Sequence, residues 1–139
     1  MSTSGAESTT RVVLDTSAYS RLRGAHEGVI ALLAAAEIVV VPTVVIGELE
    51  AGFRLGSRTA DNQARLKEFL GEPFVLTLPV TRDVASRYGQ LFAELRKAGT
   101  PLPVNDIWIA ATALDAGAHL ITFDRDFERL SSLSLTVLS

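Results

Sequence analysis

The sequence predicts an α/β fold in which helices cover both faces of a mainly parallel sheet. Short β-branched runs alternate with longer segments of helical spacing along the 139 residues, a pattern typical of parallel strands joined by helical crossovers. The strand runs are continuously apolar, as burial on both faces requires. Apolar residues make up 47% of the chain, enough for a sizeable core. With no repeat or interdomain linker, we expect a flexible tail at 1–10 and one domain at 11–139.

Five segments have the composition of strands. They are residues 11–14, 38–41, 74–78, 120–122 and 133–138. Pro42 is expected to end the second strand, because its ring removes a backbone donor.

Segments with helical spacing of apolar residues lie between these strands. They are residues 16–22, 27–36, 43–55, 57–70, 81–98 and 104–116. Thr43 and Ser57 are expected to cap their helices. Gly99 and Gly117 are placed to end the last two. In the helix at 57–70, four residues are expected to point partly inward: Ala60, Ala64, Leu66 and Leu70. In the helix that starts at Thr81, one apolar stripe is expected to contain Val84, Tyr88, Leu91, Phe92 and Leu95.

Composition excludes several classes of function. The chain has no cysteine, which excludes disulfides, thiolate metal sites and a cysteine nucleophile and suits a reducing cytosol. Its net charge of −3 does not indicate nucleic-acid binding, so such contact would need a local patch or a bridging cation. The most apolar region, residues 30–47, is broken by Glu37 and Pro42 and is a poor membrane span. The glycine motifs of serine hydrolases, dinucleotide-binding proteins and P-loop proteins are missing.

Acidic residues occur where strands end or helices begin. Asp15 and Asp124 come just after predicted strands, Asp106 lies in a first helical turn, and Glu48 lies on the helix after the second strand. Ligands of open parallel sheets bind beyond the carboxyl ends of the strands. We therefore expect these four acids, which come from distant parts of the chain, to meet at one edge of the sheet.

Such a cluster favours a divalent cation. Two carboxylates about 5 Å apart repel each other by roughly 3 kcal/mol at an effective dielectric of 20, so four of them need separation, protons or a cation. Carboxylate ligands suit Mg²⁺ or Mn²⁺ better than Zn²⁺. His26 and His119 do not have the spacing of a metal-binding pair. The pattern indicates a metal-dependent phosphodiesterase.

Each acid also has an ordinary interpretation. Asp15 can cap the turn that follows it, and Asp106 can complement its helix dipole. Glu48 can be a solvated helix residue, and Asp124 and Asp126 can be turn residues. The case for a site is therefore joint, since no position carries it alone.

The ordered motifs resemble those of the PIN-domain nucleases, and among them the VapC toxins of bacterial toxin–antitoxin pairs. The matching pieces are VLDTS at 13–17, IGEL at 46–49, NDIWIAA at 105–111 and LITFDRDF at 120–127. Together they span nearly the whole chain. The set is specific, although any one piece is not.

The resemblance implies a three-layer αβα sandwich and a cytoplasmic endoribonuclease that depends on Mg²⁺ or Mn²⁺. It maps the acidic quartet onto Asp15, Glu48, Asp106 and Asp124, with Asp126 as an additional or alternative metal ligand. Polar positions that border the family's site match Thr16 or Ser17, Asn105 and Thr122. The resemblance also implies a homodimer and a VapB-type antitoxin that blocks the acidic pocket.

The mechanism expected from this assignment is attack of a metal-activated water on phosphorus, with Glu48 completing the metal shell or accepting the proton. Five arginines are candidates for contact with the RNA backbone, because arginine pairs well with phosphate. They are Arg21, Arg23, Arg54, Arg58 and Arg125. The alternative for each is a solvated surface residue.

Two other functions are compatible with the sequence. One is a metal-dependent hydrolase of small phosphate esters, and the other is a non-catalytic domain that binds RNA or a partner. A complete acidic quartet argues against the second. The RNA target is not encoded in any simple way.

Overall fold

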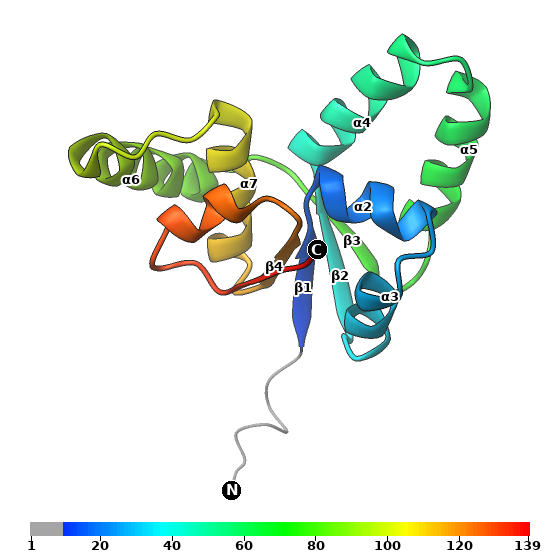
Figure 1. The fold of residues 1–139 in the computed structure, drawn as a ribbon, viewed down its shortest axis with the longest axis horizontal. Coiled ribbons are helices and arrows are strands. Elements are labelled where there is room, and N and C mark those ends of the chain that lie inside the picture. Colours follow the sequence, from blue (N-terminus) through cyan, green and yellow to red (C-terminus); the bar gives the residue numbers. More distant parts are fainter. Residues whose placement is uncertain (1–9) are drawn as a thin grey trace, which may run out of the picture.

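The computed structural model describes residues 10–139, in which five strands form one sheet (Figure 1). The strands are β1 (Arg11–Leu14), β2 (Ile38–Pro42), β3 (Val75–Leu78), β4 (His119–Thr122) and β5 (Leu135–Val137). Every adjacent pair is parallel, in the order β3-β2-β1-β4-β5. The predicted class and the five strands are confirmed. The predicted tail lies outside the described residues except for Thr10, whose carbonyl accepts hydrogen bonds from the amides of Glu37 and Ile38.

The strand order reverses at the centre of the sheet. From β1 the chain proceeds outward to β2 and β3, and it then crosses back to place β4 on the other side of β1. Val13 is consequently paired with Val40 of β2 and with Leu120 of β4. Open parallel sheets bind ligands at such a reversal, beyond the carboxyl ends of the strands. Asp15 and Asp124 follow the two central strands there.

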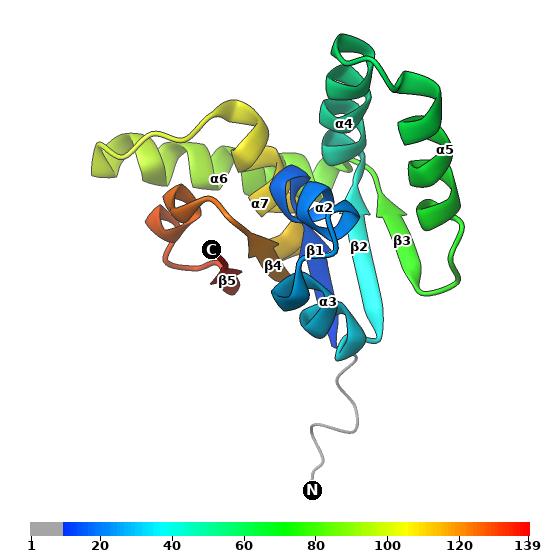
Figure 2. The same ribbon diagram turned by 45° about the vertical axis from the view of Figure 1, so that its right-hand side comes forward.

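The helices form two layers around the sheet (Figures 1 and 2). One face carries α2 (Thr16–Arg23) and α3 (Glu27–Ala34), and the other carries α6 (Arg82–Ala98) and α7 (Val104–Asp115). Parallel crossovers are right-handed, so connections that run in opposite directions across the sheet put their helices on opposite faces. The αβα sandwich is thereby confirmed.

A helical hairpin extends past the carboxyl end of β2. It consists of α4 (Thr43–Leu55) and α5 (Thr59–Leu70), and α5 returns beside β3 (Figure 2). A short 3-10 segment, η1 (Arg125–Arg129), follows β4. The first turns of α2 and α7 and the start of η1 all lie near the carboxyl end of the sheet, which is where the predicted acids were placed.

The core is built on the central strands. Val13, Leu14, Val40, Leu120 and Ile121 are buried almost completely, as expected for strands covered on both faces. Burial of each such side chain contributes about 1.5–3 kcal/mol. The strands that precede Asp15 and Asp124 are therefore anchored in the core.

The predicted stripe of α6 is correct except at its edge. Val84, Leu91 and Leu95 are buried, whereas Phe92 is 38% exposed. Successive helical residues are about 100° apart, so Phe92 lies at the edge of a stripe centred nearer to Leu91 and is only partly covered.

The predicted helix ends after α6 and α7 are correct. At the start of α6, Thr81 was predicted as the first helical residue and is the cap instead, because its hydroxyl accepts a hydrogen bond from the Val84 amide. Gly99 and Gly117 adopt positive φ angles of 71° and 61° after α6 and α7, a conformation that favours glycine.

Two predicted caps are wrong. Thr43 is the first helical residue after Pro42, and α5 starts at Thr59 with Arg58 at the cap position, one residue later than a Ser57 cap implies. The hydroxyl of Thr59 instead donates to the Phe53 carbonyl, which closes the turn between α4 and α5. Ala60 and Ala64 are exposed rather than inward, because only one side of this projecting hairpin is covered.

Candidate active site

Asp15 stands at the carboxyl end of β1, where three donors hold its side chain. Its Oδ1 atom accepts hydrogen bonds from the Ala18 amide (2.8 Å) and the Ser17 hydroxyl (2.7 Å), and its Oδ2 atom accepts one from the Thr122 hydroxyl. Only 5% of Asp15 is exposed. Burial raises the pKa of Asp15, and the charge of Asp124 adds to that rise, while the three hydrogen bonds oppose it. Asp15 therefore caps α2 and is also a constrained site residue.

Glu48 connects three helices. Its Oε1 atom accepts a hydrogen bond from the Thr16 hydroxyl of α2, and its Oε2 atom accepts one from the Asn105 side-chain amide of α7 (3.2 Å). The residue is half-buried. The alternative of a fully solvated helix residue is thus wrong for Glu48. All four supporting polar residues predicted from the sequence donate a hydrogen bond to one of the acids.

The pKa of Asp106 shows the influence of the other acids. It lies half-buried in the first turn of α7, and its pKa is raised to about 6. Burial is the largest cause. The further causes, in falling order, are the negative charges of Asp124, Glu48, Asp15 and Asp126. Carboxylates from four separate segments therefore lie within electrostatic reach of one another, as the sheet topology predicted.

Asp124 and Asp126 differ in their surroundings. Asp124 caps η1 by accepting from the Asp126 amide (2.9 Å), and its own amide donates to the Thr122 hydroxyl (3.0 Å). Asp126 forms an ion pair with Arg129, with Oδ1 and Nη2 3.2 Å apart. No ion pair within residues 10–139 involves Asp124. The geometry therefore favours Asp124 as the acid available to a cation, since Asp126 already has a counterion.

The acids are gathered but not preassembled as a metal centre. Within residues 10–139, no group of three or more His, Cys, Asp or Glu side chains has the arrangement of a metal site. The residues still fit a hard divalent cation by type, since every available ligand is an oxygen. They also fit it by charge, because burial first and then the like charges of four other acids raise the pKa of Asp106, and a cation would offset those like charges. The metal site stays a prediction.

The five predicted RNA-binding arginines fall into two groups. Three form ion pairs with acids on their own helical segment: Arg54 with Glu50, Arg58 with Asp61 (3.7 Å) and Arg125 with Glu128 (3.4 Å). The other two lie over aromatic rings. The guanidinium carbon of Arg21 lies 4.6 Å from the centroid of the Phe123 ring. That of Arg23 lies 5.5 Å from the centroid of the Tyr19 ring.

Arg129 is a residue that the sequence interpretation missed. Besides its ion pair with Asp126, its Nη1 atom donates to the Pro101 carbonyl (2.8 Å). It thereby ties η1 to the loop that leads into α7 and Asp106. The i,i+3 spacing of Asp126 and Arg129 was the available signal for the ion pair, but nothing in the sequence announced the contact with Pro101.

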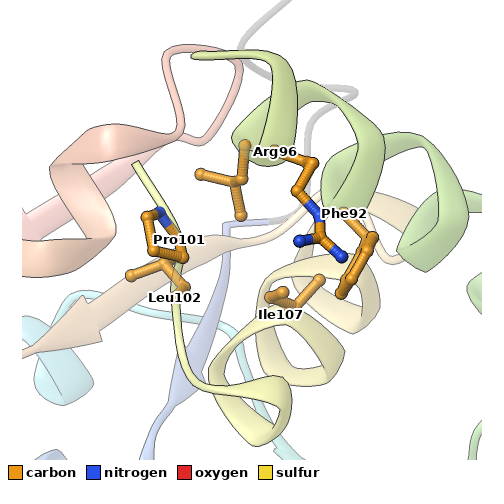
Figure 3. Close-up of a pocket in the computed structure, with 6 residues that line it drawn as sticks. Phe92, Arg96, Pro101, Leu102 and Ile107 are labelled. Carbon is orange, nitrogen blue, oxygen red and sulfur yellow. The ribbon is translucent and has the colours of Figure 1, made fainter. Parts of the chain in front are cut away.

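An apolar hollow of about 150 Å³ opens between α6 and α7 (Figure 3). It is lined by Phe92, Leu95, Arg96, Pro101, Leu102 and Ile107. In Figure 3 the Arg96 side chain lies beside the Phe92 ring, and Pro101 and Leu102 face them. None of the five acids is among the lining residues, so this hollow is separate from the acidic site.

In the described part of the chain, no helix has both the length and the apolar character needed to cross a bilayer.

Comparison with known proteins identifies the family of the chain. The family model for the PIN domain matches residues 12–133. Ribonuclease VapC5 of Mycobacterium tuberculosis is 32% identical over 118 residues, which cover 85% of this chain and 86% of the relative. Ribonuclease VapC1 of Haemophilus influenzae is 32% identical over 68% of this chain and 70% of its own length.

Solved structures agree on the fold. VapBC2 from Rickettsia felis, bound to a DNA fragment from its promoter, matches with a TM-score of 0.82 and 24% identity, covering 94% of this chain and all of that one. VapBC-5 from Mycobacterium tuberculosis matches with a TM-score of 0.66 and 30% identity over 93% of this chain and 98% of that one. The resemblance of the four motifs to PIN domains is confirmed.

Proposed function

Because this chain belongs to the PIN-domain family, we propose that it is a VapC-type endoribonuclease that hydrolyses RNA with the help of Mg²⁺. The family assignment rests on the match over residues 12–133 and on the VapC ribonucleases that align along most of the chain. Mg²⁺ is our choice of cation, with Mn²⁺ as a second, because the available ligands are carboxylate oxygens.

The observation that carries the proposal is the electrostatic convergence on Asp106. Its pKa of about 6 arises from burial together with the charges of four other acids. Structural acids at helix starts are ordinarily solvated or paired and do not accumulate in this way. Perturbed carboxylates at a topological switch point are instead typical of functional sites.

Each acid has a role that follows from its contacts. When bound, the cation would neutralise charge on the phosphate and make water a better nucleophile. Asp15, Asp106 and Asp124 would hold it. Asp15 is the most rigid of the three, because Ser17 and Thr122 fix its two oxygens. Glu48 is held between Thr16 and Asn105 at the edge of the cluster, a position suited to proton acceptance.

The biological setting follows from the relatives. VapBC-5 from Mycobacterium tuberculosis is a member of the VapBC family of toxin–antitoxin systems. We infer that this chain is the toxin of such a pair, that a VapB-type antitoxin covers the acidic site, and that the toxin forms a homodimer. Its RNA substrate would place the activity in the cytoplasm.

A cleavage assay with purified protein tests the proposal. RNA oligonucleotides are incubated with Mg²⁺, with Mn²⁺ or with EDTA, and the ends of the products are mapped by sequencing. We expect internal cuts that require the divalent ion and no turnover of small phosphate esters. Turnover of esters without RNA cleavage would identify a small-molecule phosphohydrolase. RNA binding without divalent-dependent cleavage would identify a non-catalytic domain.

A further inference from the structure

Arg21 and Phe123 form a stacked pair beside the acidic site. The Arg21 guanidinium lies over the Phe123 ring at 4.6 Å, and the same ring meets the His26 ring edge-on, with centroids 4.9 Å apart. Phe123 is half-buried, whereas Arg21 is exposed. The aromatic ring therefore restrains the guanidinium while its outer side stays open to solvent.

The donors of Arg21 are uncommitted. Within residues 10–139 no salt bridge includes Arg21, in contrast to Arg54, Arg58 and Arg125, which are paired with acids. A guanidinium offers five N–H donors in a planar fork that matches phosphate. Because the ring already restrains the side chain, less conformational entropy is lost when those donors bind a ligand.

Ser17 connects this pair to the acids. It lies one helical turn before Arg21 on α2, about 6 Å along the helix axis. Its hydroxyl donates to Asp15 (2.7 Å) and accepts from the Phe123 amide (3.1 Å). The site carboxylate and both members of the stacked pair thus share one fixed residue. Arg21 and Phe123 therefore both lie next to residues that hold the Asp15 carboxylate, since Ser17 precedes Arg21 by one turn and Thr122 precedes Phe123.

RNA can approach the acidic cluster only if positive charge lies nearby. Four carboxylates act on Asp106, which is itself an acid, and the whole chain carries a net charge of −3. An RNA strand that approaches the cluster is repelled, except where a bound metal ion or a free cationic side chain offsets the charge. Arg21 provides such a side chain next to the site.

We propose that the Arg21 guanidinium, braced on Phe123, binds the RNA phosphate adjacent to the one that is cleaved. This inference rests on the proposed endoribonuclease function and adds a substrate-binding residue to it. Phe123 is a positioning residue in this arrangement, since it acts through Arg21. The structural alternative is that Arg21 only complements the dipole at the end of α2.

Salt dependence separates the two roles. Each phosphate contact to a single strand contributes about 0.7 to the slope of log affinity against log salt concentration. RNA binding is measured by fluorescence anisotropy in EDTA, and kcat and KM are measured in Mg²⁺, both across a salt series. We expect Arg21→Ala to weaken binding about 10-fold and to reduce the slope by about 0.7, with the loss in KM rather than kcat.

Three further variants sharpen the test. Arg21→Lys keeps the charge and should retain the salt slope while losing affinity. The lysine ammonium cannot bind phosphate through two parallel N–H groups and cannot stack on the Phe123 ring. Phe123→Leu should weaken binding about 2- to 5-fold with the slope unchanged. Arg87→Ala removes a positive charge that is paired with Asp115 elsewhere on the surface and should leave binding as in the wild type.

The outcomes are distinct for the two proposals. An Arg21→Ala protein with wild-type slope and KM overturns the phosphate contact, even if RNA is cleaved normally. A lower melting temperature with unchanged slope identifies the purely structural role and also overturns it. A wild-type protein that binds RNA with the Arg21-dependent slope but never cleaves it overturns the proposed nuclease function and supports the contact. A wild-type protein that neither binds RNA in EDTA nor cleaves it in Mg²⁺ overturns both.

Discussion

At each end of β4, two hydroxyl groups contact one ionisable side chain, but the number of charged groups nearby differs. At the carboxyl end, the hydroxyls of Ser17 and Thr122 hold Asp15. At the amino end, the hydroxyls of Ser134 and Thr136 lie 2.6 Å from the two ring nitrogens of His119.

Burial moves both groups toward the neutral form. It raises the pKa of Asp15 and lowers the pKa of His119. The difference is that like charges from other segments add to the shift only at the carboxyl end, where Asp124 raises the pKa of Asp15 further. Hydroxyl contacts and burial are therefore common to structural and functional polar sites, and accumulated like charge distinguishes the candidate active site.

Removing the ionisable group at each end gives the largest expected contrast. Asp15→Asn should lower the rate of Mg²⁺-dependent RNA cleavage by more than about 100-fold. Removing a residue that only orients a metal ligand costs roughly 10–100-fold, and Asp15 is expected to be a ligand itself. It should keep or raise the melting temperature in EDTA, because asparagine still caps α2 and the buried charge is gone. His119→Gln should leave cleavage unchanged. Equal activity of Asp15→Asn and wild type would contradict the essential role of Asp15.

The pair of acids after β4 provides the next test. Asp124→Asn should reduce cleavage as severely as Asp15→Asn, because Asp124 has no basic partner within residues 10–139. Asp126→Asn should retain most of the activity and lose stability of about 0–1 kcal/mol, the usual contribution of an exposed ion pair such as that with Arg129. Single-turnover rates and thermal unfolding measure both effects. The reverse ranking of the two variants would make Asp126 the main acid.

Hydroxyl removal compares the two ends directly. Thr122→Val deletes the donor to Asp15 and the acceptor of the Asp124 amide, so cleavage should fall about 10–100-fold. Thr136→Val deletes one contact of His119 and should affect stability only, by about 1 kcal/mol. The readouts are kcat/KM and urea unfolding. A loss of cleavage in Thr136→Val as large as in Thr122→Val would break the distinction between the two ends.

The pH dependence of stability is the smallest expected effect and has opposite signs at the two ends. The folded-state pKa of Asp106 is about 6, against an ordinary 3.8, so its contribution favours the folded state in acid and is lost as pH rises through about 6. The lowered pKa of His119 has the opposite consequence, because stability is lost as pH falls below the ordinary 6.5.

Urea unfolding in EDTA at pH 5 and pH 7 separates these contributions. For each protein, the free energy of unfolding at pH 7 is subtracted from that at pH 5. This difference should be smaller for Asp106→Asn than for the wild type, because the variant lacks the carboxyl group that favours the folded state in acid. His119→Gln should show the reverse change. Addition of Mg²⁺ at pH 7 should stabilise the wild type and leave Asp15→Asn unaffected. Identical pH profiles for the wild type and Asp106→Asn would contradict the crowding of carboxylates around Asp106.

Much of this architecture was predictable from local pattern. Continuous apolar runs such as that ending at Leu14 identified the parallel strands, and the topology rules for such sheets then placed Asp15 and Asp124 at one edge. Helix starts were less predictable. Thr43 and Ser57 have good capping side chains, but Pro42 and the contact of Thr59 with Phe53 decided where those helices begin.

The sequence by itself determined which segments are strands, which residues are acidic and how they are ordered along the chain, because those properties depend on side-chain type and on neighbours a few positions away. Tertiary structure alone decided where Thr16, Asn105 and Thr122 direct their hydrogen bonds and which ring Arg21 lies over. Those contacts join residues as far apart as Asp15 and Thr122, and their geometry depends on how the whole sheet and its helices pack. Charge accumulates at one end of β4 for the same reason, since only the folded chain brings four distant segments together.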